Sequence, residues 1–255
     1  MIISHRHRFI FMHCRKAAGS SIAASLAPHL GPADIHLGTW PEAFEQGVPP
    51  NRRAWRDLLH PLAGFSFGCR LLRNPARLFD RDHAVAALNG AQRLKYRAPL
   101  GYSPEHAHAR RVSAAYPEAW RSYFKFCFVR NPFDRAVSDY IWRTRKKENA
   151  VMTFREFLDQ LSRRDFTSST IPRHFDNWPI YTIDNRIAVD FIGRFERLEE
   201  DLARVFEFLG LDRRILVHAK SMPRQKRYQD WYGDPERSLV ERLFANELRE
   251  FEYRF

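Results

Sequence analysis

The sequence predicts an α/β fold in which a P-loop-like parallel sheet is flanked by helices. Short runs of β-branched and aromatic residues alternate with helical patterns, which is typical of a mainly parallel sheet. The two clearest runs, Arg8–His13 and Tyr123–Val129, each lead within a few residues to a helix start. We therefore expect a single domain over residues 1–255, with an irregular, mostly helical insertion at about 31–120.

The other elements follow from capping residues and periodicity. A helix begins at Ser20 and is ended by Pro28 and Gly31. Asn131 and Pro132 predict the N-cap and first position of a helix, whose cap Asp134 helps to close. The remaining expected elements are helices at about 51–60, 77–89 and 104–115, a helix from Thr153, a strand at 187–193, and helices at 196–209 and 234–250.

The composition is that of a folded protein with a basic surface. The chain has 255 residues, of which 44% are hydrophobic, so a packed core is expected. A net charge of +12 favours anionic partners: nucleic acid, an anionic membrane, an acidic polysaccharide or a phosphorylated nucleotide. The three cysteines form no CxxC pair, so the sequence supports neither a disulfide framework nor a zinc ribbon. With no signal-like N-terminus and no run of about 18 apolar residues, we expect a cytoplasmic protein without a transmembrane segment.

The segment Arg15–Ser21 lies between the first strand and its helix. Gly19 allows a tight turn and the close approach of an anion, and the N–H groups of a helix start bind phosphate. Ser20 and Ser21 add hydroxyl donors, and Lys16 adds an ammonium that can stabilise charge on a leaving group. Lys16 precedes the only glycine of this segment, whereas the lysine of an ATP- or GTP-hydrolysing P-loop directly follows a glycine. An ordinary turn with a solvated lysine is the alternative.

A second anion site is predicted at the end of the second strand. Arg130 stands at the carboxyl edge of the sheet, where α/β folds bind ligands. Ser138 lies on the following helix, two turns beyond Arg130. An arginine fork and a hydroxyl together suit a phosphate.

These two motifs resemble those of a known family. Phe11–Ile22 is similar to the 5′-phosphosulfate loop of sulfotransferases that use 3′-phosphoadenosine-5′-phosphosulfate (PAPS), in particular the carbohydrate branch and its bacterial family 2-like members. Tyr123–Tyr140 resembles their 3′-phosphate motif, Val189–Asp201 their third conserved segment, and Phe251–Phe255 the ending of bacterial members. The resemblance covers most of the chain except about 31–100.

The resemblance implies PAPS as co-substrate, adenosine 3′,5′-bisphosphate as product, and no metal. It places Lys16 at the bridging oxygen, and Arg130 and Ser138 at the 3′-phosphate. The residues implied around the 5′-phosphate and in a late basic loop are Arg15, Gly19, Ser20, Ser21, Lys226 and Arg227, the last two within Arg224–Tyr228. Three positions depart from the family pattern: Arg15 replaces a proline, Ala17 replaces a threonine and so loses one donor, and Ser20 replaces a threonine but keeps the hydroxyl.

Sulfuryl transfer to a hydroxyl group needs a general base. His106 is the first candidate, because Glu105–Arg110 resembles a His-Ala helix start in bacterial relatives. His36 and Glu42 are the rivals, since some relatives use a glutamate shortly after the loop. His106 and His108 do not suit a metal, because side chains two residues apart on a helix diverge.

The expected activity is therefore sulfuryl transfer from PAPS to a saccharide or glycoconjugate. Peripheral contact with a membrane stays open, no nucleic-acid partner is expected, and no oligomeric state is predicted. A non-enzymatic anion-binding module and a degenerate P-loop nucleotide kinase are the alternatives. No RNA-binding or zinc-finger motif favours the first, and the position of the lysine disfavours the second.

Overall fold

The computed structural model describes residues 1–145, 152–168, 170–212 and 226–255, and the chain forms two compact units. The first unit comprises residues 1–14, 18–128 and 179–221. The second comprises residues 15–17, 129–178 and 222–255. In the described ranges, no helix is both long and apolar enough to cross a membrane.

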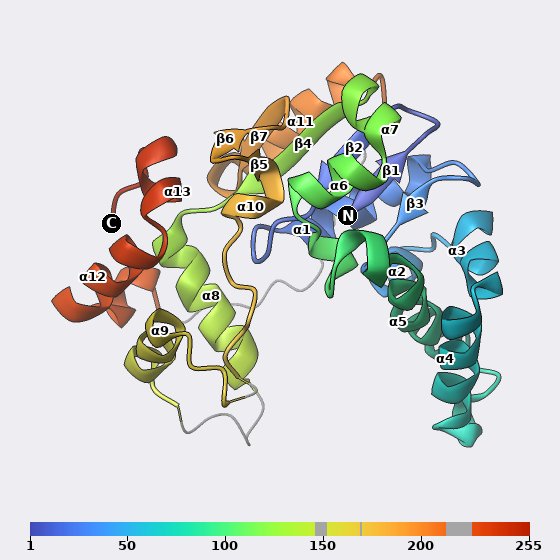
Figure 1. Ribbon diagram of the computed structural model, residues 1–255, viewed down its shortest axis with the longest axis horizontal. Coiled ribbons are helices and arrows are strands. Elements are labelled where there is room, and N and C mark those ends of the chain that lie inside the picture. Colours follow the sequence, from blue (N-terminus) through green and yellow to red (C-terminus); the bar gives the residue numbers. More distant parts are fainter. Residues whose placement is uncertain (146–151, 169, 213–225) are drawn as a thin grey trace. The chain divides into compact units, whose positions relative to one another are not determined.

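The first unit contains a five-stranded sheet with the order β3-β1-β2-β4-β7 (Figure 1). The expected parallel pair is present: β2 (Phe9–Met12) runs parallel to β4 (Phe124–Val129), with Phe11 opposite Phe126. Strand β1 pairs antiparallel with both β2 and β3, so the sheet is mixed. The other strands are β1 (Ile2–Ser4), β3 (Ile35–His36) and β7 (Phe191–Arg194), and β5 (Thr182–Ile183) forms a separate hairpin with β6 (Arg186–Ile187).

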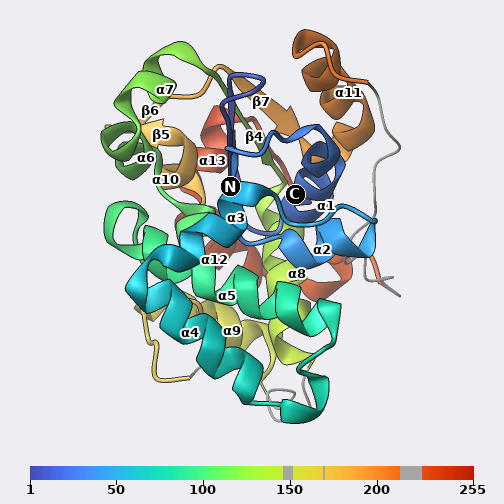
Figure 2. The ribbon, with the colours of Figure 1, turned by 90° about the vertical axis from the view of Figure 1, so that its right-hand side faces the viewer.

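Helices cover both faces of this sheet. On one face, α1 (Gly19–Leu26) and α11 (Leu198–Phe208) bury Ile22 and Val205 against strand residues such as Phe9 and Phe126. On the other side lie α6 (Ala109–Ala115) and α7 (Pro117–Ser122), as the two views agree (Figures 1 and 2). The resulting layers are those of an α/β protein, which confirms the α/β class, although the sheet is mixed rather than parallel throughout.

The segment from 31 to 120 is mostly helical, as expected. Its helices before α6 are α2 (Trp40–Glu45), α3 (Arg52–Arg56), α4 (Pro61–Leu72) and α5 (Arg81–Leu100). Trp40, Ala54 and Leu88 form a small core among α2, α3 and α5. Asp57 is fully buried beside it and accepts hydrogen bonds from the side chains of Arg53, Gln92, Lys95 and Tyr96.

The second unit is helical. It contains α8 (Pro132–Thr144), α9 (Phe154–Arg163), α12 (Asp234–Leu243) and α13 (Ala245–Glu250), and α10 (Trp178–Tyr181) begins where it ends. Phe133, Phe157 and Val240 lie in its core. A buried ion pair joins Arg135 of α8 to Glu247 of α13.

Several local predictions are confirmed. Asn131 accepts a hydrogen bond from the N–H of Phe133 as the N-cap of α8. Thr153 and Glu156 form the expected capping box of α9. Gly210 takes a positive φ of 62° directly after the turn that ends α11.

Other elements differ from the prediction. The strand expected at 187–193 is divided into β6 and β7, because Asp190 between them turns to bond the backbone and ammonium of Lys125. The final helix is two helices, α12 and α13, separated at Phe244, whose φ of −124° is not helical and whose ring is buried. The helix expected at 104–115 is a 3₁₀ turn (Pro104–His106) followed by α6. Strands β1, β3 and β5 and helices α2, α4, α7 and α10 were not predicted.

Candidate functional site

In the second unit, the guanidinium of Arg130 is the centre of a group of predicted site residues. Its Nε and Nη2 bind Asp134 Oδ2 at 2.7 and 2.6 Å. Its Nη1 donates to the backbone oxygen of Lys16 at 3.1 Å and to Ser138 Oγ at 3.4 Å. The structure thus brings Lys16 to Arg130 and Ser138, from which it is separated by at least 114 positions along the chain. Asn131 caps α8, and Asp134 binds Arg130.

The Lys16 side chain lies over an aromatic ring of α8. Its Nζ is 5.4 Å from the ring centroid of Trp142, within the range of a cation–π contact. Trp142 is one helical turn beyond Ser138, so the two residues share a face of α8. The Lys16 backbone has a φ of 59°, in the left-handed region that non-glycine residues seldom occupy. Such positions cluster at functional sites.

Arg15 is held at its backbone. The side chain of Asn177, fully buried, accepts from the Arg15 N–H at 2.9 Å and donates to the Arg15 carbonyl at 3.0 Å. Burial, and then the charges of Arg15 and Arg173, lower the pKa of His174. The second unit therefore presents positive charge beside the Lys16 loop, which suits phosphate groups.

The start of α1 in the first unit has the form of an anion site. In this fully described helix no side chain caps the N-terminus, and its first turn carries no acidic residue. Gly19, Ser20 and Ser21 are its first three residues and lie at the positive end of the helix dipole, a position that suits an anion. The left-handed residue before the helix is Ala18, with φ 59°.

At Gly19 it is the ring of a neighbouring side chain that requires the absence of a Cβ. The φ of Gly19 is not positive; instead, the ring of His13 lies so close that a Cβ on Gly19 would be 1.9 Å from it. Any larger residue at position 19 must therefore displace the His13 ring.

His106 lies against the end of β2 in the first unit. Its Nδ1 is 2.8 Å from the backbone oxygen of His13, and the two rings meet edge to face with centroids 4.6 Å apart. A carbonyl oxygen only accepts hydrogen bonds, so Nδ1 carries the proton and Nε2 is the basic nitrogen of the neutral ring. Glu105, next to it, is anchored to Arg93 of α5 at 3.1 Å.

The two rival bases are placed differently. His36 is fully buried on β3, with Nε2 2.5 Å from Thr39 Oγ1, and burial lowers its pKa to about 3. Such a group is inaccessible and weakly basic. Glu42 is only 4% exposed, in the first turn of α2.

The late basic loop is described in part. Lys226 and Arg227 are exposed, and the N–H of Arg227 donates to Asp230 at 3.0 Å. Arg224 and Gln225 lie outside the described residues. No group of three or more histidine, cysteine or acidic side chains suited to a metal occurs in the described ranges.

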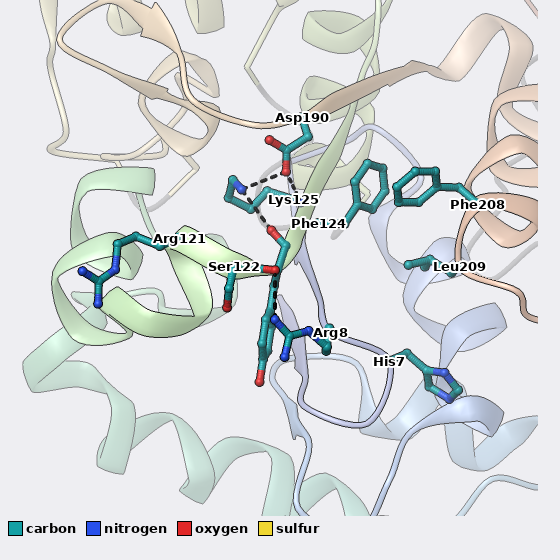
Figure 3. Close-up of a pocket in the computed structure, with 10 residues that line it drawn as sticks. His7, Arg8, Arg121, Ser122, Phe124, Lys125, Asp190, Phe208 and Leu209 are labelled. Carbon is teal, nitrogen blue, oxygen red and sulfur yellow. Dashed lines mark hydrogen bonds and ion pairs between the residues drawn. The ribbon is translucent and has the colours of Figure 1, made fainter.

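A pocket of about 700 Å³ lies at the opposite edge of the sheet from His13 and His106. It is lined by residues at the amino ends of β2 and β4, among them Arg8 and Lys125 (Figure 3). Lys125 Nζ is already bound to Asp190 at 2.8 Å and to the Tyr123 carbonyl at 2.9 Å. Since α/β folds bind ligands at the carboxyl ends of strands, we do not assign the activity to this pocket.

Three residues of the site were not found from the sequence. Trp142 could have been found from its spacing of four from Ser138 on an expected helix. His13 ends the first predicted strand, a position that marks it as a neighbour of the loop. Asn177 is separated from Arg15 by 162 positions, and no local pattern connects them.

Comparisons with known proteins agree with these motifs. The model of a family described as the sulfotransferase family matches residues 1–254. An uncharacterized protein of Archaeoglobus fulgidus is 37% identical over 95 residues, which are 37% of this chain and 74% of that protein. Carbohydrate sulfotransferase 12 of Mus musculus is 23% identical over 188 residues, covering 54% of this chain and 44% of the relative. Carbohydrate sulfotransferase 14 of Danio rerio is 32% identical over 123 residues, covering 37% and 32%. The matched regions thus span less than half of these carbohydrate sulfotransferases. No solved structure matches the chain.

Proposed function

The chain belongs to the sulfotransferase family, and we propose that it transfers a sulfuryl group from PAPS to a hydroxyl group of a carbohydrate. One observation carries the proposal: Arg130 Nη1 is shared between Ser138 Oγ and the backbone of Lys16. A donor with a 3′-phosphate and a 5′-phosphosulfate needs both a phosphate-binding fork and an adjacent loop with a lysine. The residues present fit such a donor.

In this proposal, Arg130 and Ser138 bind the 3′-phosphate. Asp134 binds Nε and Nη2 of the guanidinium and so fixes its orientation, with Nη1 directed at Ser138. Because Arg130 is only 9% exposed, its charge is poorly screened by solvent and its hydrogen bonds to an anion are strong. Arg15, the amides of Gly19 to Ser21 and the two serine hydroxyls bind the 5′-phosphate side, and Lys226 and Arg227 add positive charge.

Lys16 acts on the leaving group. As the bond between sulfur and the bridging oxygen breaks, that oxygen keeps the electron pair, and an ammonium beside it stabilises the developing charge. The contact with Trp142 holds the Lys16 side chain in one direction before the reaction, so less ordering is needed at that moment. The same ammonium substitutes for a metal ion, so we propose a metal-free reaction.

His106 accepts the proton of the acceptor hydroxyl. The His13 carbonyl holds the proton on Nδ1, which leaves Nε2 as the atom that takes a proton while the acceptor oxygen bonds to sulfur. His13 and Lys16 are separated by only two residues along the chain. The burial of His36 removes it as a rival, whereas Glu42 remains one to test.

The acceptor is proposed to be a saccharide or glycoconjugate. Its support is the similarity to proteins named carbohydrate sulfotransferases. The net charge of +12 favours an acidic saccharide over a neutral one.

Calorimetric titration tests the donor. Adenosine 3′,5′-bisphosphate should bind more tightly than AMP or ATP, and Arg130→Ala should remove most of that preference. A charged hydrogen bond of about 1.5–3 kcal/mol corresponds to a loss of roughly tenfold to a hundredfold in affinity. Arg155→Ala, which removes an exposed arginine of α9 in the same unit, serves as the control and should leave the affinity unchanged.

Each contrary result has a meaning. Equal affinity of the wild-type protein for AMP and the bisphosphate would refute the assignment of PAPS. A preference for ATP would favour a nucleotide kinase, and tight binding of oligonucleotides alone would favour an anion-binding module.

A further inference from the structure

An unpartnered apolar face runs along α4 in the first unit. The solvent-exposed side chains of this helix are large and apolar, and they recur at helical spacing. The exposed ones on α4 and the turn before it are Leu59 (81%), Leu62 (62%), Phe65 (76%) and Leu72 (67%), with Cys69 on the same face. Phe79, beyond the helix, is 96% exposed. A contiguous apolar surface of this kind marks an interaction site.

The opposite face of α4 is already used. Ala63 is fully buried, and Phe67 packs on the core that includes Leu88 of α5. In both views α4 lies along α5 and away from the strands of the five-stranded sheet (Figures 1 and 2). Helix α4 therefore already buries one apolar face against its neighbours. The exposed face is a second apolar surface on the same helix.

Arginines predominate among the charged residues around this face. Six arginines between positions 52 and 81 are exposed: Arg52, Arg56, Arg70, Arg73, Arg77 and Arg81. Of the two aspartates in this segment, Asp57 is fully buried and Asp80 is paired with Arg77 at 2.5 Å. The guanidinium of Arg70 lies against Gly90 of α5, whereas Arg73 directly follows Leu72 at the end of the apolar face.

We propose that α4 and the turns beside it bind the surface of an anionic lipid bilayer. An apolar helix face bordered by arginines is suited to lie in the plane of the interface, with its apolar side chains among the acyl chains and its arginines at the phosphates. Twelve residues extend about 18 Å, which is too short to span the hydrocarbon core, so the helix lies on the membrane.

Charge also argues against a second copy of the chain as the occupant. A twofold-symmetric dimer would set the arginines of one copy against those of the other, because both copies use the same patch. The headgroups of an anionic bilayer would instead attract these arginines. The function that follows is to bring the enzyme to an acceptor at a membrane surface.

Vesicle co-sedimentation tests the proposal, without donor or acceptor, so its outcome is independent of the sulfuryl-transfer assignment. The wild-type protein should sediment with vesicles of phosphatidylcholine mixed with phosphatidylglycerol, more weakly with phosphatidylcholine alone, and less as salt is raised. Phe65→Ser should lower partitioning by about tenfold, and Arg73→Glu by about fivefold or more. The controls are Tyr102→Ser and Arg186→Glu, which change exposed residues elsewhere in the same unit and should bind normally.

Thermal melts followed by circular dichroism establish that each variant is folded, and Leu72→Ser replaces Phe65→Ser if the latter does not fold. Absence of binding to either vesicle, or equal binding by Phe65→Ser and wild type, overturns the proposal. A concentration-dependent dimer in size-exclusion chromatography that Phe65→Ser abolishes would overturn it too, and would assign the face to a second copy.

Discussion

The chain passes from strand to helix at two places that carry proposed donor-binding residues, and it does so in contrasting ways. From β4 into α8, near neighbours fix each step: Asn131 caps the helix, Pro132 starts it, and Asp134 and Ser138 bind Arg130. From β2 into α1, no side chain of the described segment caps the helix, and Lys16 and Ala18 both take left-handed φ values. There the chain is held by partners that are remote in sequence.

These remote partners are Asn177, which binds the Arg15 backbone in the second unit, and His106, which binds the His13 carbonyl in the first. The difference has a physical reason. A helix start that its own side chains cap is stable but closed to ligands, whereas an uncapped start must be stabilised from outside and keeps its N–H groups for an anion. In the proposed function, the transition from β4 to α8, the second along the chain, orients one arginine, and the transition from β2 to α1, the first, surrounds a phosphate.

The largest effect is expected at the remote partner His106. If its Nε2 takes the proton of the acceptor, His106→Ala should lower kcat by about 10²–10⁴-fold and leave the affinity for adenosine 3′,5′-bisphosphate nearly unchanged. Steady-state kinetics and calorimetry measure the two quantities. Glu42→Gln is the parallel variant: a collapse of kcat in Glu42→Gln alone would transfer the role of base to Glu42.

The next largest effect on kcat is expected at Lys16. Removal of a group that stabilises charge only in the transition state should cost about 10²–10³ in kcat, so Lys16→Ala should bind the product nucleotide almost normally but turn over slowly. Trp142→Leu should lower kcat less, because the ammonium remains but is less well held. Near-normal turnover of Lys16→Ala would mean that the first transition is only a turn.

The same contrast explains what could be predicted from the sequence. The second transition was predicted closely, since Asn131, Pro132, Arg130 and Ser138 lie within nine residues and each acts locally. The loop at Lys16 was recognised by its composition, but its support from Asn177 was not, because that contact depends on the tertiary fold. Likewise β1 and β3 are short strands whose positions depend on pairing with each other and with β2. The split of 187–193 depends on Asp190 meeting Lys125, which only the fold brings together.

The free energy of unfolding should also distinguish the two strand-to-helix transitions. Asn177→Ala removes two hydrogen bonds from a fully buried site and leaves the Arg15 backbone groups unsatisfied, so a loss of about 2–3 kcal/mol is expected in denaturant unfolding. Asn131→Ala removes a helix cap and should cost about 1 kcal/mol. Asn177→Ala should also weaken binding of adenosine 3′,5′-bisphosphate. If both variants lose the same stability and affinity, the first transition does not depend on its remote partner.

The smallest effect concerns the strain at Ala18. A non-glycine residue with φ 59° and ψ 18° costs about 1 kcal/mol or more, and glycine removes that cost while it increases the entropy of the unfolded chain. Ala18→Gly should therefore raise the free energy of unfolding by up to about 1 kcal/mol. The neighbouring Ala17→Gly is the matched control: Ala17 is buried and is not among the positive-φ residues, so the same change there should destabilise by about 0.5–1 kcal/mol. Chemical denaturation of the two variants measures the difference. If Ala18→Gly is instead less stable than wild type, the left-handed backbone before α1 is not strained. The two strand-to-helix transitions would then not differ in backbone strain.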